Sequence, residues 1–187
     1  MTTRLVLLCS ASTASLRAGA VPADEPIDAK GRAGLARLAG QFQGYDKILT
    51  SPARAATETA RGLGLSATPE PALRDCDFGR WAGRALAETE AEDAEALALW
   101  LGDPRAAPHG GESFAEVLDR VGACMDGLEE NCAILAIAQA AVLRAAIVHA
   151  LGAPAHSMLR NDVSPLSRVR LSGGRGKWRF RGLTLVK

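Results

Sequence analysis

The order of apolar and polar residues along the chain predicts strands that alternate with helices. Short apolar runs at 5–8, 47–50 and 133–138 are typical of buried strands in a parallel sheet. The C-terminal segment reads differently, because residues 168–171 and 177–185 flank Gly173-Gly174 and so predict a β-hairpin.

Helices are predicted between these strands. Asp28 is a candidate N-cap for a helix that places Leu35, Leu38 and Phe42 on one face. Ser51-Pro52 predicts a second helix that starts at the proline and runs towards residues 63–64. Further helices are expected over the acidic segment 85–101, after the capping box at 113–116, and over 140–151.

This alternation predicts an α/β fold with a mainly parallel central sheet between two layers of helices. No repeat or linker interrupts the pattern, so we expect a single domain over residues 1–187. Ligands bind at the carboxyl ends of the strands in such sheets. The segments that follow three of the predicted strands, 9–17, 51–55 and 139–141, are therefore the places to look for a site.

The amino-acid composition does not alter the predicted fold, but its charge balance bears on possible partners. The chain has 22 Lys and Arg against 21 Asp and Glu, so no basic surplus favours a nucleic acid partner. We interpret six basic residues near the C-terminus as a solvated strand face, with a nucleic acid or an acidic partner as the alternative; they are Arg168, Arg170, Arg175, Lys177, Arg179 and Arg181.

The cysteines and the lengths of the apolar runs indicate the cell compartment. The run at 5–8 is too short for a signal peptide, and no stretch reaches the roughly 18 apolar residues of a membrane span. Four cysteines without metal-ligand spacing are expected to be reduced and buried. We expect a cytoplasmic protein with no membrane partner; the sequence leaves its oligomeric state open.

Five motifs in order resemble the histidine phosphatase superfamily, in the branch of phosphoglycerate mutases and α-ribazole phosphatases. They are DEPIDAKG at 24–31, TSPARAATETA at 50–60, LRDCDFGRWAG at 73–83, GGES at 110–113 and AQAAVLR at 138–144. The resemblance covers nearly the whole chain. It implies a phosphoglycerate mutase-like α/β/α fold with a helical cap inserted over roughly residues 81–129.

The resemblance also locates the family's phosphate pocket, and the basic residues expected there are missing. Cys9 stands where the family has its first clamping arginine, and Ser10 where it has the nucleophilic histidine. Ala55 replaces the second arginine and Gln139 the second histidine. Asp75 keeps a carboxylate at the acid position, which is usually Glu.

These replacements predict a pseudoenzyme that binds a ligand or a protein partner and needs no cofactor. Each lost charge-stabilising donor costs catalysis about 3–4 kcal/mol, and the lost nucleophile costs far more. The alternative is a weak or repurposed phosphatase or hydrolase that uses Ser10, Cys9 and Asp75. The loop after Cys9 superficially resembles the C-x5-R loop of low-molecular-weight tyrosine phosphatases, but Ser15 stands where that loop has its arginine.

Other polar residues complete the set of candidates. The hydroxyls of the loop after the first strand are interpreted first as helix caps. The alternative is weak ligand binding at this helix N-terminus by Ser10, Ser12, Thr13, Arg17, Arg54 and Gln139. Asp75 and Asp77 are two residues apart, but turn or salt-bridge roles are favoured and no metal is expected. His109 is expected near the pocket rim, and surface or packing roles are favoured for it, for His149 and for His156.

Overall fold

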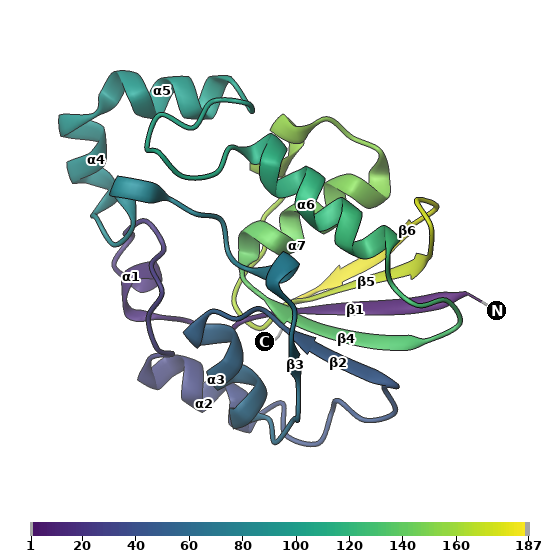
Figure 1. Cartoon of the computed structure of the whole chain (residues 1–187). Helices are drawn as coiled ribbons and strands as arrows, with labels where there is room; N and C mark the ends of the chain where they lie inside the picture. Colours follow the sequence, from purple (N-terminus) through teal and green to yellow (C-terminus); the bar gives the residue numbers. More distant parts are fainter. Residues whose placement is uncertain (1, 186–187) are drawn as a thin grey trace.

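Residues 2–185 are described by a computed structural model in which six strands form one sheet (Figure 1). The strands are β1 (Thr3–Cys9), β2 (Lys47–Thr50), β3 (Thr68–Pro69), β4 (Ala133–Ala138), β5 (Arg168–Gly173) and β6 (Arg179–Thr184). Their order is β3-β2-β4-β1-β5-β6. The first four are parallel, whereas β5 and β6 form an antiparallel hairpin beside β1. The mainly parallel α/β sheet and the hairpin are thus confirmed.

Helices cover both faces of this sheet (Figure 1). On one face lie α2 (Ala29–Ala36) and α3 (Arg54–Gly62), and on the other α6 (Phe114–Asp126) and α7 (Ala140–Leu151). Side chains alternate along β1, so Leu5 and Leu7 join the apolar cluster of α6 and α7, whereas Leu8 joins that of α2 and α3. This explains why the run is apolar throughout.

Two predicted caps are present. The Asp28 carboxylate accepts a hydrogen bond from the Gly31 N–H at 2.6 Å and starts α2. Ser113 and Glu116 form the complete capping box of α6, in which each side chain accepts from the other residue's backbone N–H.

The start of α3 was predicted wrongly. The helix begins at Arg54, two residues after Pro52, and its N-cap Ala53 is extended. The Ser51 hydroxyl accepts from the Ala53 N–H in a short turn instead of capping the helix. The carboxylate of Asp24, from a distant loop, accepts from the Arg54 N–H at 2.7 Å. A tertiary contact has therefore taken the role assigned to a local one.

Short elements extend beyond the carboxyl ends of the strands. They are α1 (Ala14–Arg17), α4 (Leu86–Glu92), α5 (Ala94–Gly102) and 3₁₀ turns at Pro71–Leu73, Gly79–Trp81 and Ala155–Arg160. The acidic segment forms two helices, because Asp93 leaves the helical conformation and accepts from Trp81 Nε1 at 2.7 Å and Arg80 Nη2 at 2.6 Å. Within the range expected as a cap, α4 and α5 project past the sheet, whereas α6 packs against α7 (Figure 1).

The four cysteines are free thiols, and Cys9, Cys76 and Cys132 are buried. Between residues 2 and 185, none of the helices has the length and apolar character to span a bilayer.

Candidate functional site

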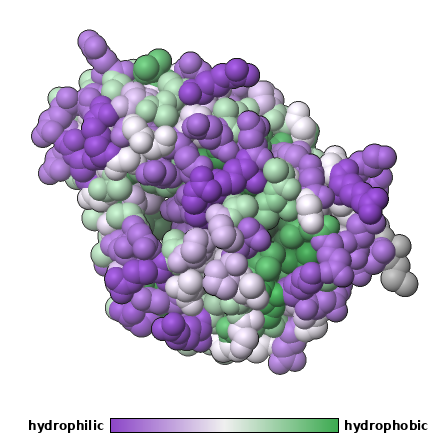
Figure 2. All heavy atoms as spheres, in the orientation of Figure 1, coloured by the Kyte–Doolittle hydropathy of each residue, from purple (hydrophilic) through white to green (hydrophobic). Residues whose placement is uncertain are grey.

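A cavity of about 1120 Å³ lies at the carboxyl ends of β1 and β4, where the α/β architecture predicts a site. The surface is hollowed on the side of the molecule where α4 and α5 lie (Figure 2). The five positions that the resemblance assigns to the phosphate pocket all line this cavity; they are Cys9, Ser10, Ala55, Asp75 and Gln139. The fold therefore brings together residues that are up to 130 positions apart in the chain.

The loop after β1 is held by its backbone. Ser10 N donates to the Ala138 carbonyl at 2.8 Å, and Ala11 N donates to the Thr59 hydroxyl at 2.9 Å. Ser10 is only 6% exposed. We name the five pocket positions Cys9, Ser10, Ala55, Asp75 and Gln139 the floor of the cavity, and the end of β1 and this loop supply the first two of them.

Cys9 is a poor nucleophile in this position. Burial, and after it the charge of Asp75, raise the pKa of its thiol to about 12, although Arg144 partly opposes them. The thiol is therefore protonated near neutral pH, and the thiolate needed for attack is scarce.

Asp75 is the acidic group of the floor. Burial raises the pKa of this carboxyl from 3.8 to about 7, against the hydrogen bond from the Cys76 N–H and the positive charge of Arg120. Near neutral pH the group is close to half protonated. It can therefore donate as well as accept a hydrogen bond.

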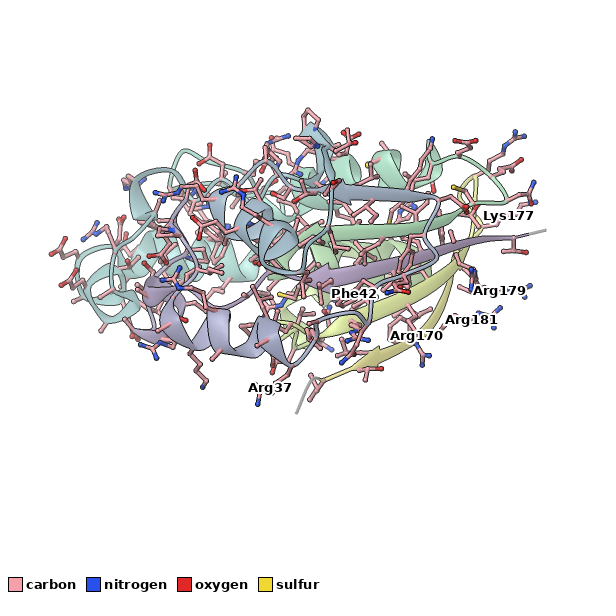
Figure 3. All side chains as sticks on the ribbon, turned by 90° about the horizontal axis from the view of Figure 1, so that it is seen from below. Arg37, Phe42, Arg170, Lys177, Arg179 and Arg181 are labelled. Carbon is pink, nitrogen blue, oxygen red and sulfur yellow. The ribbon has the colours of Figure 1, made fainter. Side chains whose placement is uncertain are left out.

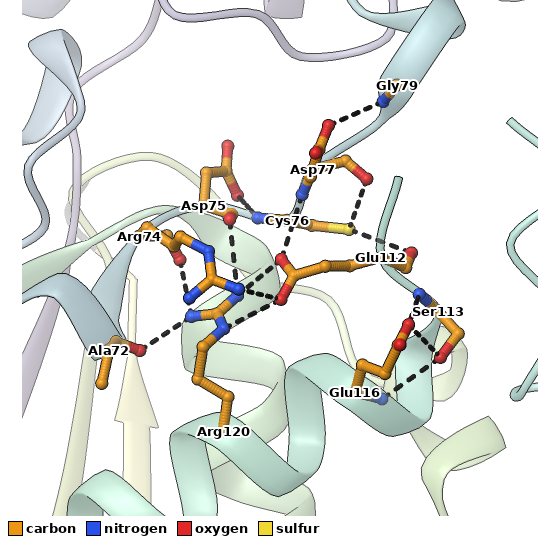
Figure 4. A network of polar contacts seen from close by, with 10 residues as sticks. All are labelled: Ala72, Arg74, Asp75, Cys76, Asp77, Gly79, Glu112, Ser113, Glu116 and Arg120. Atoms are coloured by element: carbon orange, nitrogen blue, oxygen red, sulfur yellow. Dashed lines mark hydrogen bonds and ion pairs between the residues drawn. The ribbon is translucent and has the colours of Figure 1, made fainter. Parts of the chain in front are cut away.

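A polar network fixes the loop that carries Asp75 (Figure 4). Arg120 of α6 donates to the carbonyls of Ala72 at 2.7 Å and Arg74 at 3.0 Å, and pairs with Glu112 through both Nε and Nη2. Glu112 also accepts from the Asp77 N–H at 3.2 Å. The sequence predicted no role for Glu112, because the GGES motif served there only as evidence of the family resemblance.

Gln139 and Ser10 are the floor groups with free hydrogen-bonding capacity. Gln139 precedes α7 but its side chain does not cap it, and its Oε1 atom is buried without a partner among the described residues. No hydrogen bond to the Ser10 hydroxyl is found in the described part of the chain. A hydroxyl and an amide thus face the cavity as uncharged polar groups.

The other predicted ligand-binding residues are already engaged. The Ser12 hydroxyl donates to Asp28 at 2.9 Å, and Thr13 caps α1. The predicted Arg17 and Arg54, and two further arginines of this region, each have a carboxylate partner: Arg17–Asp28 (2.8 Å), Arg54–Glu58 (3.6 Å), Arg74–Glu112 (2.5 Å) and Arg144–Asp162 (3.7 Å).

The arginines differ in their access to the cavity. Arg54 is not one of the residues that line it, whereas Arg17, Arg74 and Arg144 are. Arg144 is the least committed of them, because Asp162 is 90% exposed and the buried Arg144 Nε has no partner among residues 2–185. It is also the arginine whose charge acts on Cys9. The exposed Lys30 and Arg37 line the cavity from the side of α2.

Aromatic side chains form an apolar wall of the cavity. Trp100 lies 4.3 Å from Phe114 and 5.8 Å from Trp81, measured between ring centroids, and all three line the cavity. Phe78 packs edge-on against Trp100 at 6.2 Å. The cavity therefore combines a small polar floor, in which Asp75 is the one ionisable carboxyl, with a large apolar wall.

The histidines lie elsewhere. His109 is packed between Trp81 and Trp100 and is only 2% exposed, so it belongs to the aromatic cluster and does not form an open rim. Its burial lowers its pKa. His149 Nε2 lies 3.0 Å from Asp126 Oδ1 of α6, near the C-terminal end of α7, and His156 is exposed. Over residues 2–185, no group of His, Cys, Asp and Glu has the arrangement of a metal site.

A profile of the Histidine phosphatase superfamily (branch 1) matches residues 6–185, so the chain belongs to this superfamily. Two solved structures illustrate the fold. The α-ribazole phosphatase of Shigella flexneri is 27% identical with a TM-score of 0.83, and the match covers 97% of this chain and 96% of that one. A mycobacterial glucosyl-3-phosphoglycerate phosphatase in complex with VO3 is 26% identical with a TM-score of 0.82, covering 95% and 96%.

Curated relatives match over shorter segments. A glucosyl-3-phosphoglycerate phosphatase of Mycolicibacterium vanbaalenii is 40% identical over 77 residues, 39% of this chain and 34% of the relative. A bifunctional protein of Mycobacterium tuberculosis is 39% identical over 82 residues, 42% of this chain and 22% of the relative. The chain thus matches at most about a third of the length of these two relatives.

Proposed function

We propose that this chain is a non-catalytic member of the superfamily that binds a small molecule in the cavity. The observation that carries the proposal is the composition of the floor. Cys9, Ser10, Ala55 and Gln139 line the cavity at the positions that the resemblance assigns to two arginines and two histidines. The cavity persists, but none of the four positions that the resemblance assigns to cationic phosphate-binding groups carries a basic side chain.

The energetics favour loss of catalysis. A phosphate ester brings up to two negative charges, and each missing preorganised donor costs about 3–4 kcal/mol of transition-state stabilisation. Ser10 would need a base within reach to act as nucleophile. The Gln139 amide takes no proton near neutral pH, and an ionised Asp75 would repel the anion.

The ligand is proposed to be an uncharged molecule with a polar end and an apolar body. Ser10 and Gln139 offer a hydroxyl and an amide for its polar end. Trp100 and Phe78, which are partly exposed, offer apolar surface for its body. A concave cavity of this size suits a small molecule better than a protein segment, which makes a protein partner the second choice.

One observation favours the alternative of a weak hydrolase. A carboxyl whose pKa is about 7 is well suited to general acid–base catalysis at neutral pH, and Asp75 lines the same cavity as Ser10. In this alternative Asp75 would accept the proton from the Ser10 hydroxyl as that oxygen bonds to the phosphorus of a phosphate ester. The P–O bond to the leaving alcohol would break, and Asp75 would return the proton to that alcohol.

Turnover measurements distinguish the two proposals. The purified protein is assayed with p-nitrophenyl phosphate and a panel of phosphate monoesters, beside its Ser10→Ala and Asp75→Asn variants and an active α-ribazole phosphatase. We expect the wild type and both variants to give the same background rate. Turnover that Ser10→Ala abolishes would establish the hydrolase instead.

A further inference from the structure

A second surface of the molecule, remote from the cavity, carries an unusual charge pattern. The α2–α3 face of the sheet is covered by helices over β2 and β4, but it is open over the hairpin (Figure 3). Four exposed arginines occupy this open part, and we name them the arginine face: Arg4, Arg170, Arg179 and Arg181.

Strand register places these side chains on one face. Arg4 pairs with Ser172 across β1 and β5, and Ser172 pairs with Arg179 across β5 and β6. Directly paired residues in a sheet project on the same side. Arg170, two residues before Ser172, therefore shares this side.

A bulge adds the fourth arginine. Arg170 pairs with Gly182 and Leu171 with Phe180, which leaves Arg181 as the extra residue. Its Nε donates to the Ser172 hydroxyl at 2.7 Å, and this bond holds it beside Arg179. Gly182 has a φ of +142°, a conformation that favours glycine and that shapes this irregular stretch. The backbone is thus irregular where it presents a further cation, Arg181. Figure 3 shows Arg181 near Arg170 and Arg179.

These arginines have no ion-pair partner among residues 2–185. The acidic residues that precede β2 and β4 are occupied: Asp46 accepts from the Ala133 N–H, Glu129 pairs with Lys47, and Glu130 pairs with Arg175. Four neighbouring unpaired guanidinium groups repel one another. An anionic partner would relieve this repulsion.

The type of residue indicates the partner's chemistry. Guanidinium groups bind phosphate oxygens through two parallel hydrogen bonds, which lysine cannot do. Phe180 pairs with the inward-facing Leu171 and so lies on the opposite side, and Trp178 is buried. The arginine face therefore lacks both the apolar centre of a stable protein interface and the aromatic platform used to stack single-stranded bases.

We propose that the arginine face binds the phosphate backbone of duplex nucleic acid without reading its sequence. The formal net charge of +1 conceals this local surface, and the expectation of no nucleic acid partner rested on that total. Phosphate contacts of this kind position a protein on the duplex but carry no base specificity. The proposal is independent of the cavity and of its ligand.

Fluorescence anisotropy with labelled duplexes of three unrelated sequences tests it. Four phosphate contacts predict a slope of about −3.6 in log affinity against log salt, so raising salt fourfold should weaken binding about 150-fold. The Arg170→Gln/Arg181→Gln variant should lose about half of that slope. The control Arg32→Gln/Arg61→Gln, which changes exposed arginines of α2 and α3, should bind as the wild type does.

Three outcomes would overturn the proposal. They are absence of binding at low salt, equal loss of binding in the control, and strong preference for one of the sequences. Circular dichroism spectra establish that the variants are folded. Sedimentation without nucleic acid completes the test, because an arginine-face variant that changes only self-association would assign this surface to a second copy of the chain.

Discussion

Replacing Asp75 by Asn should make the stability of the protein less sensitive to pH. Burial raises the pKa of this carboxyl from 3.8 to about 7, so the folded state binds the proton more tightly than the unfolded state does. Between these two pKa values the wild type therefore loses stability as pH rises. At 1.36 kcal/mol per pKa unit, the loss reaches about 4 kcal/mol above pH 7.

The asparagine keeps the oxygen that accepts from the Cys76 N–H, but it cannot ionise. Urea unfolding at pH 5 and pH 8 measures the stability of the variant relative to the wild type. This difference should shift in favour of the variant by about 2–3 kcal/mol between the two pH values. Asp77→Asn, an exposed carboxylate in the same loop, is the matched control. If the difference for Asp75→Asn does not change with pH, the carboxyl is ionised in the folded protein and the reasoning is wrong.

Three further predictions follow from local geometry. Burial raises the pKa of the Cys9 thiol to about 12, so Cys9 should resist iodoacetamide at pH 7.5 in the folded protein. It should react once urea unfolds the chain, and mass spectrometry would detect the modified residue. Ser113→Ala should lower the free energy of unfolding in urea by about 1 kcal/mol, because it removes the cap of α6. Ser113→Asp should lose less stability, because its carboxylate can still cap the helix. Gly79→Ala should lower the Tm, because φ is +48° there and an added Cβ would lie 2.1 Å from the His109 carbonyl; an unchanged Tm would contradict this.

Local patterns predicted the elements of the fold well. The strand at 133–138 and the helix at 140–151 have the predicted bounds, because the apolar run and the helical segment are both governed by neighbouring residues. The capping box at Ser113 is local in the same way. The start of α3 was predicted wrongly, because its cap, Asp24, comes from 30 residues away.

The sequence predicted which residues line the candidate site, but not how deeply they are buried or how they are protonated. Motif order placed Cys9, Ser10, Ala55, Asp75 and Gln139 together, and all line one cavity. Their protonation depends on burial and on distant partners that no local pattern encodes. The support of the Asp75 loop by an arginine 45 residues away is such a case, and so is the burial of His109 between two tryptophans.

Titration with vanadate, the phosphate analogue bound in the structure of a mycobacterial relative, tests the central claim most directly. Calorimetry compares this protein, its Ser10→Ala and Arg144→Gln variants, and that active relative as a positive control. The account predicts saturable binding by the relative alone, because the floor of the cavity lacks the basic groups of the family. Saturable vanadate binding by this protein that either variant abolishes would contradict it.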